Sequence, residues 1–384
     1  MRHLFLSKGL FAGLVVLGAS VAGPAGANPS ILFDVKTGQV LEHEEAFKRW
    51  HPASLTKMMT AYVAFRAINA GELTLQSPIK ITKISAAEPP SKMGYKPGSV
   101  MTLDNALKMM LGKSANDIAA AIGENVGGTL PAFAGRMNAE AQRLGMTGSH
   151  FTNPNGLHDP ENYTTARDMA LLVRAIRLEF PQYGSYFTIE GLTTNGKNRI
   201  RGFNPLLGRF AGADGMKTGF VCASGYNLAG SATRDGRTLA AVVLGERTPW
   251  GRADRAADLL GQGFSTAASG SVTLGTLQPY GENLTTPTDM REIVCSKAGA
   301  SERSDGLDAN GKPKFKSPYM AELNRDLQFV RVGLGGATGP APAAFAAIDA
   351  KNNQANVPIP TWRPDRPAPT APVAAQGDAA SRPQ

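Results

Sequence analysis

Apolar residues recur every three or four positions in several stretches of this chain, which is the spacing of an α-helix with one buried face. The first stretch begins at Leu55 and ends at Gly71, so a buried helix is predicted directly after Ser54. A threonine precedes three of the later stretches, as expected for a residue that caps a helix N-terminus. The further predicted helices cover residues 103–112, 130–144, 169–176 and 252–260, and the last is expected to end at Gly261.

Other stretches alternate apolar and polar residues or are rich in β-branched residues, which indicates strands. Residues 30–34 and 39–42 read as a hairpin, and Arg234-Asp-Gly-Arg237 is a strong turn signal between two longer strands. The predicted strands are residues 30–34, 39–42, 79–82, 217–221, 226–233 and 238–245, with residues 271–274 as one more candidate. The pattern predicts an α/β (α+β) protein with an antiparallel sheet flanked by helices and an all-helical subdomain.

The N-terminus has the order of a secretory signal peptide. Arg2 and Lys8 precede a short apolar run, and small residues follow up to Ala27. A retained membrane span is the alternative, but the run is short for one. We therefore expect cleavage before Asn28 and an exported, periplasmic protein; peripheral attachment to the outer face of the cytoplasmic membrane stays open.

Composition divides the mature chain into three parts. Residues 28–264 hold the predicted helices and strands and are numerous enough for one large core. Residues 265–350 form a region of uncertain structure, in which residues 274–294 and 329–332 could pack on the first part. Residues 351–384 are rich in proline and alanine, as in a disordered tail.

The net charge of +9 falls to +7 once Arg2 and Lys8 are removed. A basic exported protein is expected to associate weakly with anionic lipid heads or wall polymers. No basic cluster interleaved with aromatic residues supports nucleic acid as a partner. The five histidines and the two cysteines lack metal-ligand spacing, so neither a metal nor a cofactor is expected. A disulfide between Cys222 and Cys295 is allowed, but Cys222 as a small buried apolar residue is favoured.

Three short motifs carry the candidate chemistry. Ser54-Leu-Thr-Lys57 places a hydroxyl and an amine three residues apart, hence on one face of a helix, where the amine can take the hydroxyl proton. Ser114-Ala-Asn116 follows, and Lys217-Thr-Gly219 comes last. The helix N-terminus at Ser54 also favours a developing negative charge.

Two other matches to these motifs are rejected on physical grounds. Ser77-Pro-Ile-Lys80 runs into a predicted strand, which would turn its serine and lysine to opposite faces. Lys36-Thr-Gly38 links two short predicted strands, where Gly38 suits the positive φ of a turn. These residues are therefore expected to be structural.

The order of the three motifs resembles that of the penicillin-recognising serine enzymes, and within them the low-molecular-mass D-alanyl-D-alanine carboxypeptidases, over roughly residues 28–264. The resemblance implies a fold like that of β-lactamases and transpeptidases. Further segments that carry it are Asn153-Pro-Asn-Gly-Leu-His-Asp159, Thr164-Thr-Ala-Arg-Asp168, Ser224-Gly-Tyr-Asn-Leu228, Gly245-Glu-Arg-Thr248 and Gly251-Arg252.

The resemblance also implies a substrate, the peptidoglycan stem peptide ending in D-Ala-D-Ala, and β-lactams as inhibitors. Ser54 would be the nucleophile and Lys57 its base. Ser114 would pass the proton to the leaving amine, while Asn116 would hold the substrate amide. The remaining expected roles are the carboxylate contacts of Lys217, Thr218 and Arg252, close substrate approach at Gly219, and an oxyanion hole made by the amides of Ser54 and Phe220.

Several alternatives remain open at this stage. Singly, Ser54, Ser114 and Asn116 could be helix caps and Lys217 a solvated strand end. A class A β-lactamase shares the motifs, but no ExxLN stretch lies between Asn116 and Lys217. A DD-endopeptidase would use the same residues, and a penicillin-binding wall scaffold without turnover is a different class. Relatives commonly carry a small β-rich second domain and an anchor helix, of which this sequence shows no convincing sign.

Overall fold

A computed structural model of the protein describes residues 28–194, 196–266, 270–281, 284–305, 307–308 and 311–348. The expected signal peptide and the expected tail lie outside the described residues. No helix among the described residues is both long enough and apolar enough to cross a membrane.

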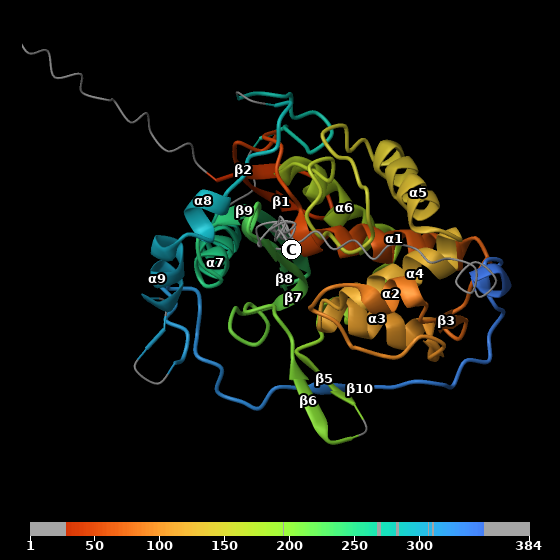
Figure 1. Ribbon diagram of the computed structural model, residues 1–384. Coiled ribbons are helices and arrows are strands. Elements are labelled where there is room, and N and C mark those ends of the chain that lie inside the picture. Colours follow the sequence, from red (N-terminus) through yellow and green to blue (C-terminus); the bar gives the residue numbers. More distant parts are fainter. Residues whose placement is uncertain are drawn as a thin grey trace, which may run out of the picture.

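The central sheet has five antiparallel strands in the order β2-β1-β9-β8-β7 (Figure 1). Successive side chains point to opposite faces, so Leu32 and Val243 enter the core beneath helix α7, whereas Ile31 and Val242 enter the larger core that contains α6. The sheet and its two covering helices comprise β1 (Ser30–Asp34), β2 (Val40–Glu44), β7 (Ala213–Val221), β8 (Gly225–Arg234), β9 (Arg237–Glu246), α6 (Ala166–Glu179) and α7 (Gly251–Ser265).

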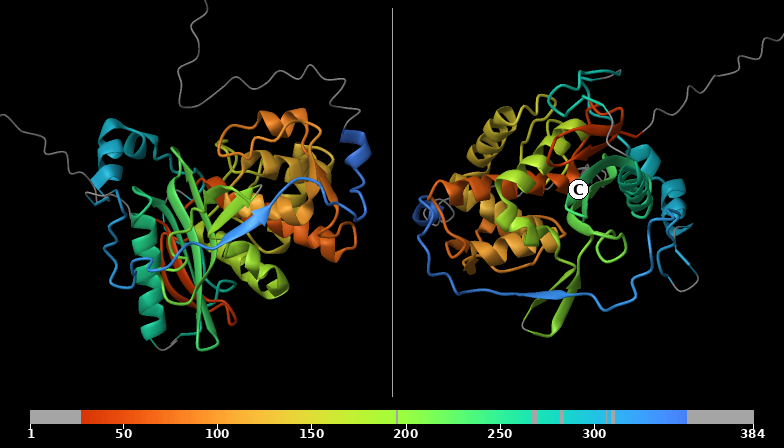
Figure 2. Two further views of the ribbon diagram at one scale, coloured as in Figure 1. Left: turned by 90° about the horizontal axis from the view of Figure 1, so that it is seen from below. Right: turned by 180° about the vertical axis from the view of Figure 1, so that it is seen from behind.

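A helical lobe lies beside the sheet, on the side away from α7 (Figure 2). Thr102, Thr129 and Thr165 cap α3, α5 and α6, because each side chain accepts a hydrogen bond from a backbone amide three residues later. The predicted all-helical subdomain is confirmed. Its elements are α1 (Thr56–Asn69), α2 (Lys83–Ala87), α3 (Leu103–Gly112), α4 (Asn116–Gly127) and α5 (Leu130–Arg143), with a small β3 (Pro78–Lys80) and β4 (Val100–Thr102) pair at its edge.

Both rejected motif matches are structural. The Ser77 hydroxyl accepts a hydrogen bond from the Thr74 amide at 2.9 Å, just before strand β3. Gly38 has a φ of 75° in the turn between β1 and β2. Neither segment therefore supplies a second nucleophile with a helical lysine.

The C-terminal segment from Ser317 to Ile348 crosses from the sheet to the helical lobe (Figures 1 and 2). Its strand β10 (Phe329–Val332) pairs in parallel with β5 (Gly191–Thr194), which also pairs with β6 (Asn198–Arg201). Further along, the amide of Gly339 donates to the carbonyl of Gln76 at 3.0 Å. Residues 329–332 thus pack on the first part of the chain, as the sequence allowed.

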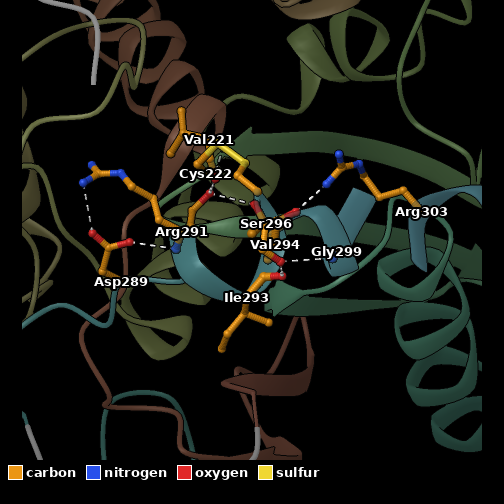
Figure 3. The surroundings of a disulfide bond; sticks show 12 residues. Val221, Cys222, Asp289, Arg291, Ile293, Val294, Ser296, Gly299 and Arg303 are labelled. Carbon is orange, nitrogen blue, oxygen red and sulfur yellow. Dashed lines mark hydrogen bonds and ion pairs between the residues drawn. A yellow bond between two sulfur atoms is a disulfide. The ribbon is translucent and has the colours of Figure 1, made fainter. Parts of the chain in front are cut away.

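A disulfide joins Cys222 to Cys295, with 5.7 Å between the Cα atoms, which corrects the favoured reading of Cys222 as an unpaired residue (Figure 3). Cys222 follows the last residue of β7, and Cys295 follows the last residue of the short helix α8 (Arg291–Val294), after which comes α9 (Lys297–Asp305). The bridge fastens these two helices to the end of β7. The pairing could not be predicted from the sequence, because nothing in it shows that two cysteines 73 residues apart lie within bonding distance in the fold.

Several elements differ from the predictions. Helix α7 continues to Ser265 instead of ending at Gly261. Gly261 lies against the Tyr319 ring, where a Cβ would come within 2.4 Å of a ring atom, so packing accounts for the glycine. Strand β7 begins at Ala213 rather than at Lys217. Residues 271–274 form only an isolated bridge, between Thr273 and Gln39.

Candidate active site

Ser54 lies in a 3₁₀ turn, Ala53–Leu55, directly before helix α1. Ala53 has a φ of 48°, in the left-handed region that non-glycine residues seldom adopt. The chain therefore turns sharply into α1, and Lys57 stands three residues later in the first turn of the helix. The Lys57 Nζ donates a hydrogen bond to the Ser54 Oγ at 2.9 Å. The motif thus forms the hydroxyl–amine pair that its spacing predicted.

Lys57 is completely buried, and its ammonium group has three acceptors. Besides Ser54, the Nζ donates to the Asn116 Oδ1 at 2.8 Å and to the Asn155 backbone oxygen at 2.5 Å. Three acceptors use all three N–H donors of a charged lysine, so the amine is held in one orientation. The structure thereby brings the first and second motifs together.

The second motif is the turn between α3 and α4. Ser114 has a φ of 61°, and Asn116 opens helix α4. Both polar groups of the Asn116 side chain are occupied, because its Nδ2 also donates to the Pro89 oxygen at 3.0 Å. The substrate contact expected of Asn116 would have to share or replace these bonds.

The third motif lies on β7, at the edge of the central sheet. The buried Lys217 Nζ donates to the Ser114 Oγ at 3.0 Å and to the Thr218 oxygen at 2.8 Å. The hydrogen bond between Lys217 and Ser114 therefore links the sheet to the helical lobe at the site. The residues of the three motifs thus form two hydrogen-bonded groups. Lys57 binds Ser54 and Asn116, and Lys217 binds Ser114.

Burial and neighbouring cations lower the pKa values of both lysines. Desolvation, and then the charge of Lys217, hold the pKa of Lys57 well below its ordinary 10.5. Desolvation, and then the charge of Arg252, lower the pKa of Lys217 to about 7. A lysine must be neutral to accept a proton from serine, and burial beside a second cation favours that neutral form.

The other predicted residues of β7 lie next to Lys217. Thr218 is buried, whereas Phe220 remains 39% exposed and stacks on Tyr226 with ring centroids 4.3 Å apart. Gly219 faces the nucleophile turn: a Cβ there would come within 2.9 Å of the Pro52 oxygen. A glycine is therefore needed at position 219 for a second purpose besides substrate approach: it lets β7 pack closely against the turn that carries Ser54.

Arg252 is buried at the start of α7 and points at the strand backbone. Its guanidinium donates to the carbonyl oxygens of Gly219 at 3.0 Å and of Asn227 at 3.3 Å. Desolvation lowers the pKa of Arg252 to about 10. The side chain therefore supports the β7 backbone and places a second cation near Lys217.

Two residues that the sequence analysis assigned no role make hydrogen bonds at the site. Asn155 supplies a backbone oxygen to Lys57, and Pro89 supplies one to Asn116. Asn155 belongs to a segment that carried the family resemblance, but a backbone acceptor leaves no signature in residue type. The loop that contains Pro89 showed no periodicity that would place it at the site.

The arrangement provides a hydroxyl nucleophile, an amine with a lowered pKa and a second buried cation in one place. These are the elements of covalent acyl transfer by serine. Among the described residues, no cluster of three or more histidine, cysteine or acidic side chains could hold a metal ion.

Comparisons with known proteins agree with one another. The family model described as D-alanyl-D-alanine carboxypeptidase matches residues 19–248. Over 61% of its length the chain is 35% identical to the D-alanyl-D-alanine carboxypeptidase DacC of Escherichia coli, and the match spans 60% of that protein. It is 31% identical to DacD of Salmonella typhimurium over 70% of this chain and 72% of that one.

Solved structures show the same similarity. The D-alanyl-D-alanine carboxypeptidase DacD from Francisella tularensis has a TM-score of 0.61 and 31% identity, covering 67% of this chain and 74% of that chain. Penicillin binding protein 5 from Haemophilus influenzae has a TM-score of 0.59 and 32% identity, covering 62% and 71%. The α+β fold expected from the sequence is thereby confirmed.

Proposed function

Because the chain belongs to the D-alanyl-D-alanine carboxypeptidase family, we propose that it removes the terminal D-alanine from peptidoglycan stem peptides ending in D-Ala-D-Ala. The observation that carries the proposal is the 2.9 Å hydrogen bond between Lys57 and Ser54, with Lys217 buried beside them. A hydroxyl paired with a low-pKa amine is the apparatus of a serine acyl transferase.

The reaction begins when neutral Lys57 takes the Ser54 proton and the Ser54 Oγ attacks the carbonyl carbon of the penultimate D-alanine. Positioned amides of Ser54 and Phe220 stabilise the oxyanion. The C–N bond then breaks, and Ser114, held by Lys217, relays the proton that Lys57 took from Ser54 to the amine of the departing D-alanine. Water hydrolyses the resulting ester and restores Ser54.

Substrate binding uses the charge on β7. Lys217 and Thr218 receive the terminal carboxylate, and Arg252 adds to the positive field from behind the strand. Asn116 contacts the substrate amide when it exchanges its bond to Lys57 or Pro89. β-Lactams acylate Ser54 by the same attack, since their strained amide occupies the position of the scissile bond.

The substrate lies in the cell wall, so the protein acts after export, in the periplasm, with its signal peptide removed. Its net positive charge favours weak association with anionic wall polymers or with the membrane surface. No nucleic acid, metal or cofactor takes part in the proposed reaction.

Product analysis on a defined pentapeptide stem and on a crosslinked dimer tests the function. The proposal predicts free D-alanine and a tetrapeptide from the monomer, and no product from the Ser54→Ala variant. Cleavage of the dimer alone would identify a DD-endopeptidase instead. Stable binding of the stem without any product would identify a wall scaffold.

A further inference from the structure

The small sheet of β10, β5 and β6 has one buried face and one exposed face. The hairpin of β5 and β6 extends away from the body of the protein, and β10 lies along β5 (Figures 1 and 2). Residues paired across strands point to one face of a sheet, and so do residues two positions apart. One face carries Leu192, which is completely buried, and Val332, which is 2% exposed. A Cβ on Gly112 would come within 3.2 Å of Leu192, so this face packs against the end of α3.

The opposite face carries three exposed arginines. Two rows of paired residues run across its three strands: Arg331, Thr193 and Arg199 form one row, and Phe329, Gly191 and Arg201 form the other. The Phe329 ring lies over Gly191, where a Cβ would come within 2.6 Å of it. The Arg199 Cζ lies 5.2 Å from the centroid of the same ring, an arrangement typical of a cation–π contact. We call Arg199, Arg201 and Arg331 the basic face.

The charges of the basic face lack partners of opposite sign. Within the part of the chain that the structure describes, none of the three arginines forms an ion pair with an acidic side chain. Arg325, which precedes β10, is different: its Nη1 donates to the Glu190 Oε2 at 2.8 Å, so Glu190 neutralises it. Three uncompensated positive charges on one surface attract a polyanion. The basic face is therefore complementary in charge to a polymer that carries carboxylates.

The basic face begins close to the candidate active site. Phe203, which is 50% exposed, lines one hollow together with Lys217 and Thr218. Arg201 stands two residues before Phe203, and two residues of chain span at most about 7 Å. A polymer that places one terminal carboxylate at Lys217 therefore has its neighbouring groups next to the basic face.

We propose that the basic face is a second contact surface for the cell wall, which binds the carboxylate ends of peptidoglycan stem peptides adjacent to the stem in the active site. The inference rests on the proposed function, because that function makes the wall polymer the substrate. An anionic membrane also has the opposite charge, but proximity to Lys217 favours the polymer, since each of its stems ends in a carboxylate. The face combines β6, inside the residues that the family model matches, with β10, outside them. None of the three motifs includes it.

Co-sedimentation of the protein with purified peptidoglycan sacculi tests the surface. The triple variant Arg199→Gln, Arg201→Gln, Arg331→Gln removes three charges and keeps long polar side chains. We expect its apparent Kd to rise about 10-fold, because each exposed charge contact contributes a factor of about two. The triple variant with lysine at the same positions keeps the charges and should bind within about 2-fold of the wild type. Weak binding by the lysine variant would contradict an electrostatic surface.

The triple variant Lys36→Gln, Lys297→Gln, Lys314→Gln is the matched control. It removes the same net charge from exposed lysines outside the basic face, so its Kd should stay within about 2-fold of the wild type. An equal rise in Kd for both glutamine variants would show that binding follows net charge alone, and would overturn the proposal. Vesicles of phosphatidylglycerol test the membrane. If the arginine variant lost vesicle binding with sacculus binding unchanged, the face would be a membrane surface and the proposal would be wrong.

Turnover measurements keep this inference separate from the proposed function. For the arginine-to-glutamine variant, kcat/KM of D-alanine release should fall about 10-fold on sacculi and change less than about 2-fold on a soluble pentapeptide stem, which has no adjacent stems. Acylation by a fluorescent penicillin should be the same as in the wild type, which shows that the site is intact. Equal losses on both substrates would contradict a surface for adjacent stems. A wild type that binds sacculi through the basic face, but releases no D-alanine from either substrate, would contradict the proposed function alone.

Discussion

At the residue scale, the site depends on two buried lysines, each with its own hydrogen-bond acceptors. Lys57 has three acceptors and Lys217 has two, and water reaches neither readily because both are buried. Burying a cation disfavours its charge, so the pKa of each lysine lies below that of a lysine in water. In the proposed mechanism the two lysines take different roles: Lys57 serves as a base, and Lys217 receives a carboxylate.

Lys217 should make turnover depend on the charge of the substrate terminus. Lys217→Ala is expected to lower kcat/KM for a stem peptide with a free carboxylate by about 10- to 100-fold, the range for losing a charge-assisted hydrogen bond. The same peptide amidated at its C-terminus should lose much less. Steady-state kinetics on both peptides checks this, and equal losses would indicate that Lys217 is structural.

The lowered pKa of Lys217 also predicts that kcat/KM decreases at alkaline pH. In the free protein the lysine carries its charge below about pH 7 and loses it above. We expect kcat/KM for the free-carboxylate peptide to fall as pH rises past about 7, since this parameter reports the free enzyme. The amidated peptide should lack that fall. A fall of the same size for both peptides would assign the decrease to another group.

At the element scale, the periodic helices and the hairpin around Arg234-Asp-Gly-Arg237 were predictable because local spacing and turn chemistry determine them. The disulfide, β10 and the full length of α7 were not, because each depends on residues far away in the sequence. Gly261 illustrates the reason. Glycine is a common helix stop, yet here it makes room for Tyr319, 58 positions later, which no local pattern shows.

Two glycine substitutions test this reading of α7. Alanine favours a helix by about 1 kcal/mol over glycine, so Gly135→Ala on the exposed side of α5 should raise stability by about 0.5–1 kcal/mol, because nothing lies within 4 Å of its new Cβ. Gly261→Ala should instead lower stability by about 1–3 kcal/mol through its clash with Tyr319. Chemical denaturation measures both. A stabilising Gly261→Ala would contradict the packing described here.

The disulfide should stabilise the protein as a crosslink between β7 and α8. The double variant Cys222→Ser, Cys295→Ser is expected to lose about 2–4 kcal/mol, given the length of chain that the bridge closes. Reducing agent should lower the melting temperature of the wild type and leave that of the double variant unchanged. A wild type insensitive to complete reduction would argue against a stabilising role.

At the scale of the whole molecule, the candidate site lies where the sheet meets the helical lobe, and the C-terminal segment contacts both. Its Ser317 amide donates to Asp254 on α7 at 3.0 Å, and its Gly335 amide donates to Val100 on β4 at 2.8 Å. The motifs predicted the residues of the site from local spacing. Their relative placement, and the position of the loop that carries Pro89, depend on contacts between distant segments, which a single sequence does not show.

Truncation tests the contribution of this segment. A chain ending at Lys316 keeps the disulfide but loses β10 and Tyr319, and we expect a lower melting temperature with acylation by penicillin retained, because every residue with a proposed chemical role precedes it. A chain ending at Lys351 should match the full-length protein in both measurements. Loss of acylation in a folded chain ending at Lys316 would show that the segment completes the site. The boundary after Phe264 stays a prediction.

The central claim is that Ser54 forms the acyl-enzyme, and mass spectrometry of the protein after exposure to benzylpenicillin tests it most directly. The account predicts an increase in intact mass equal to one penicillin, located by peptide mapping to the segment with Ser54, retained in Ser77→Ala and absent from Ser54→Ala. An adduct on another residue, or one that persists in a folded Ser54→Ala variant, would contradict it.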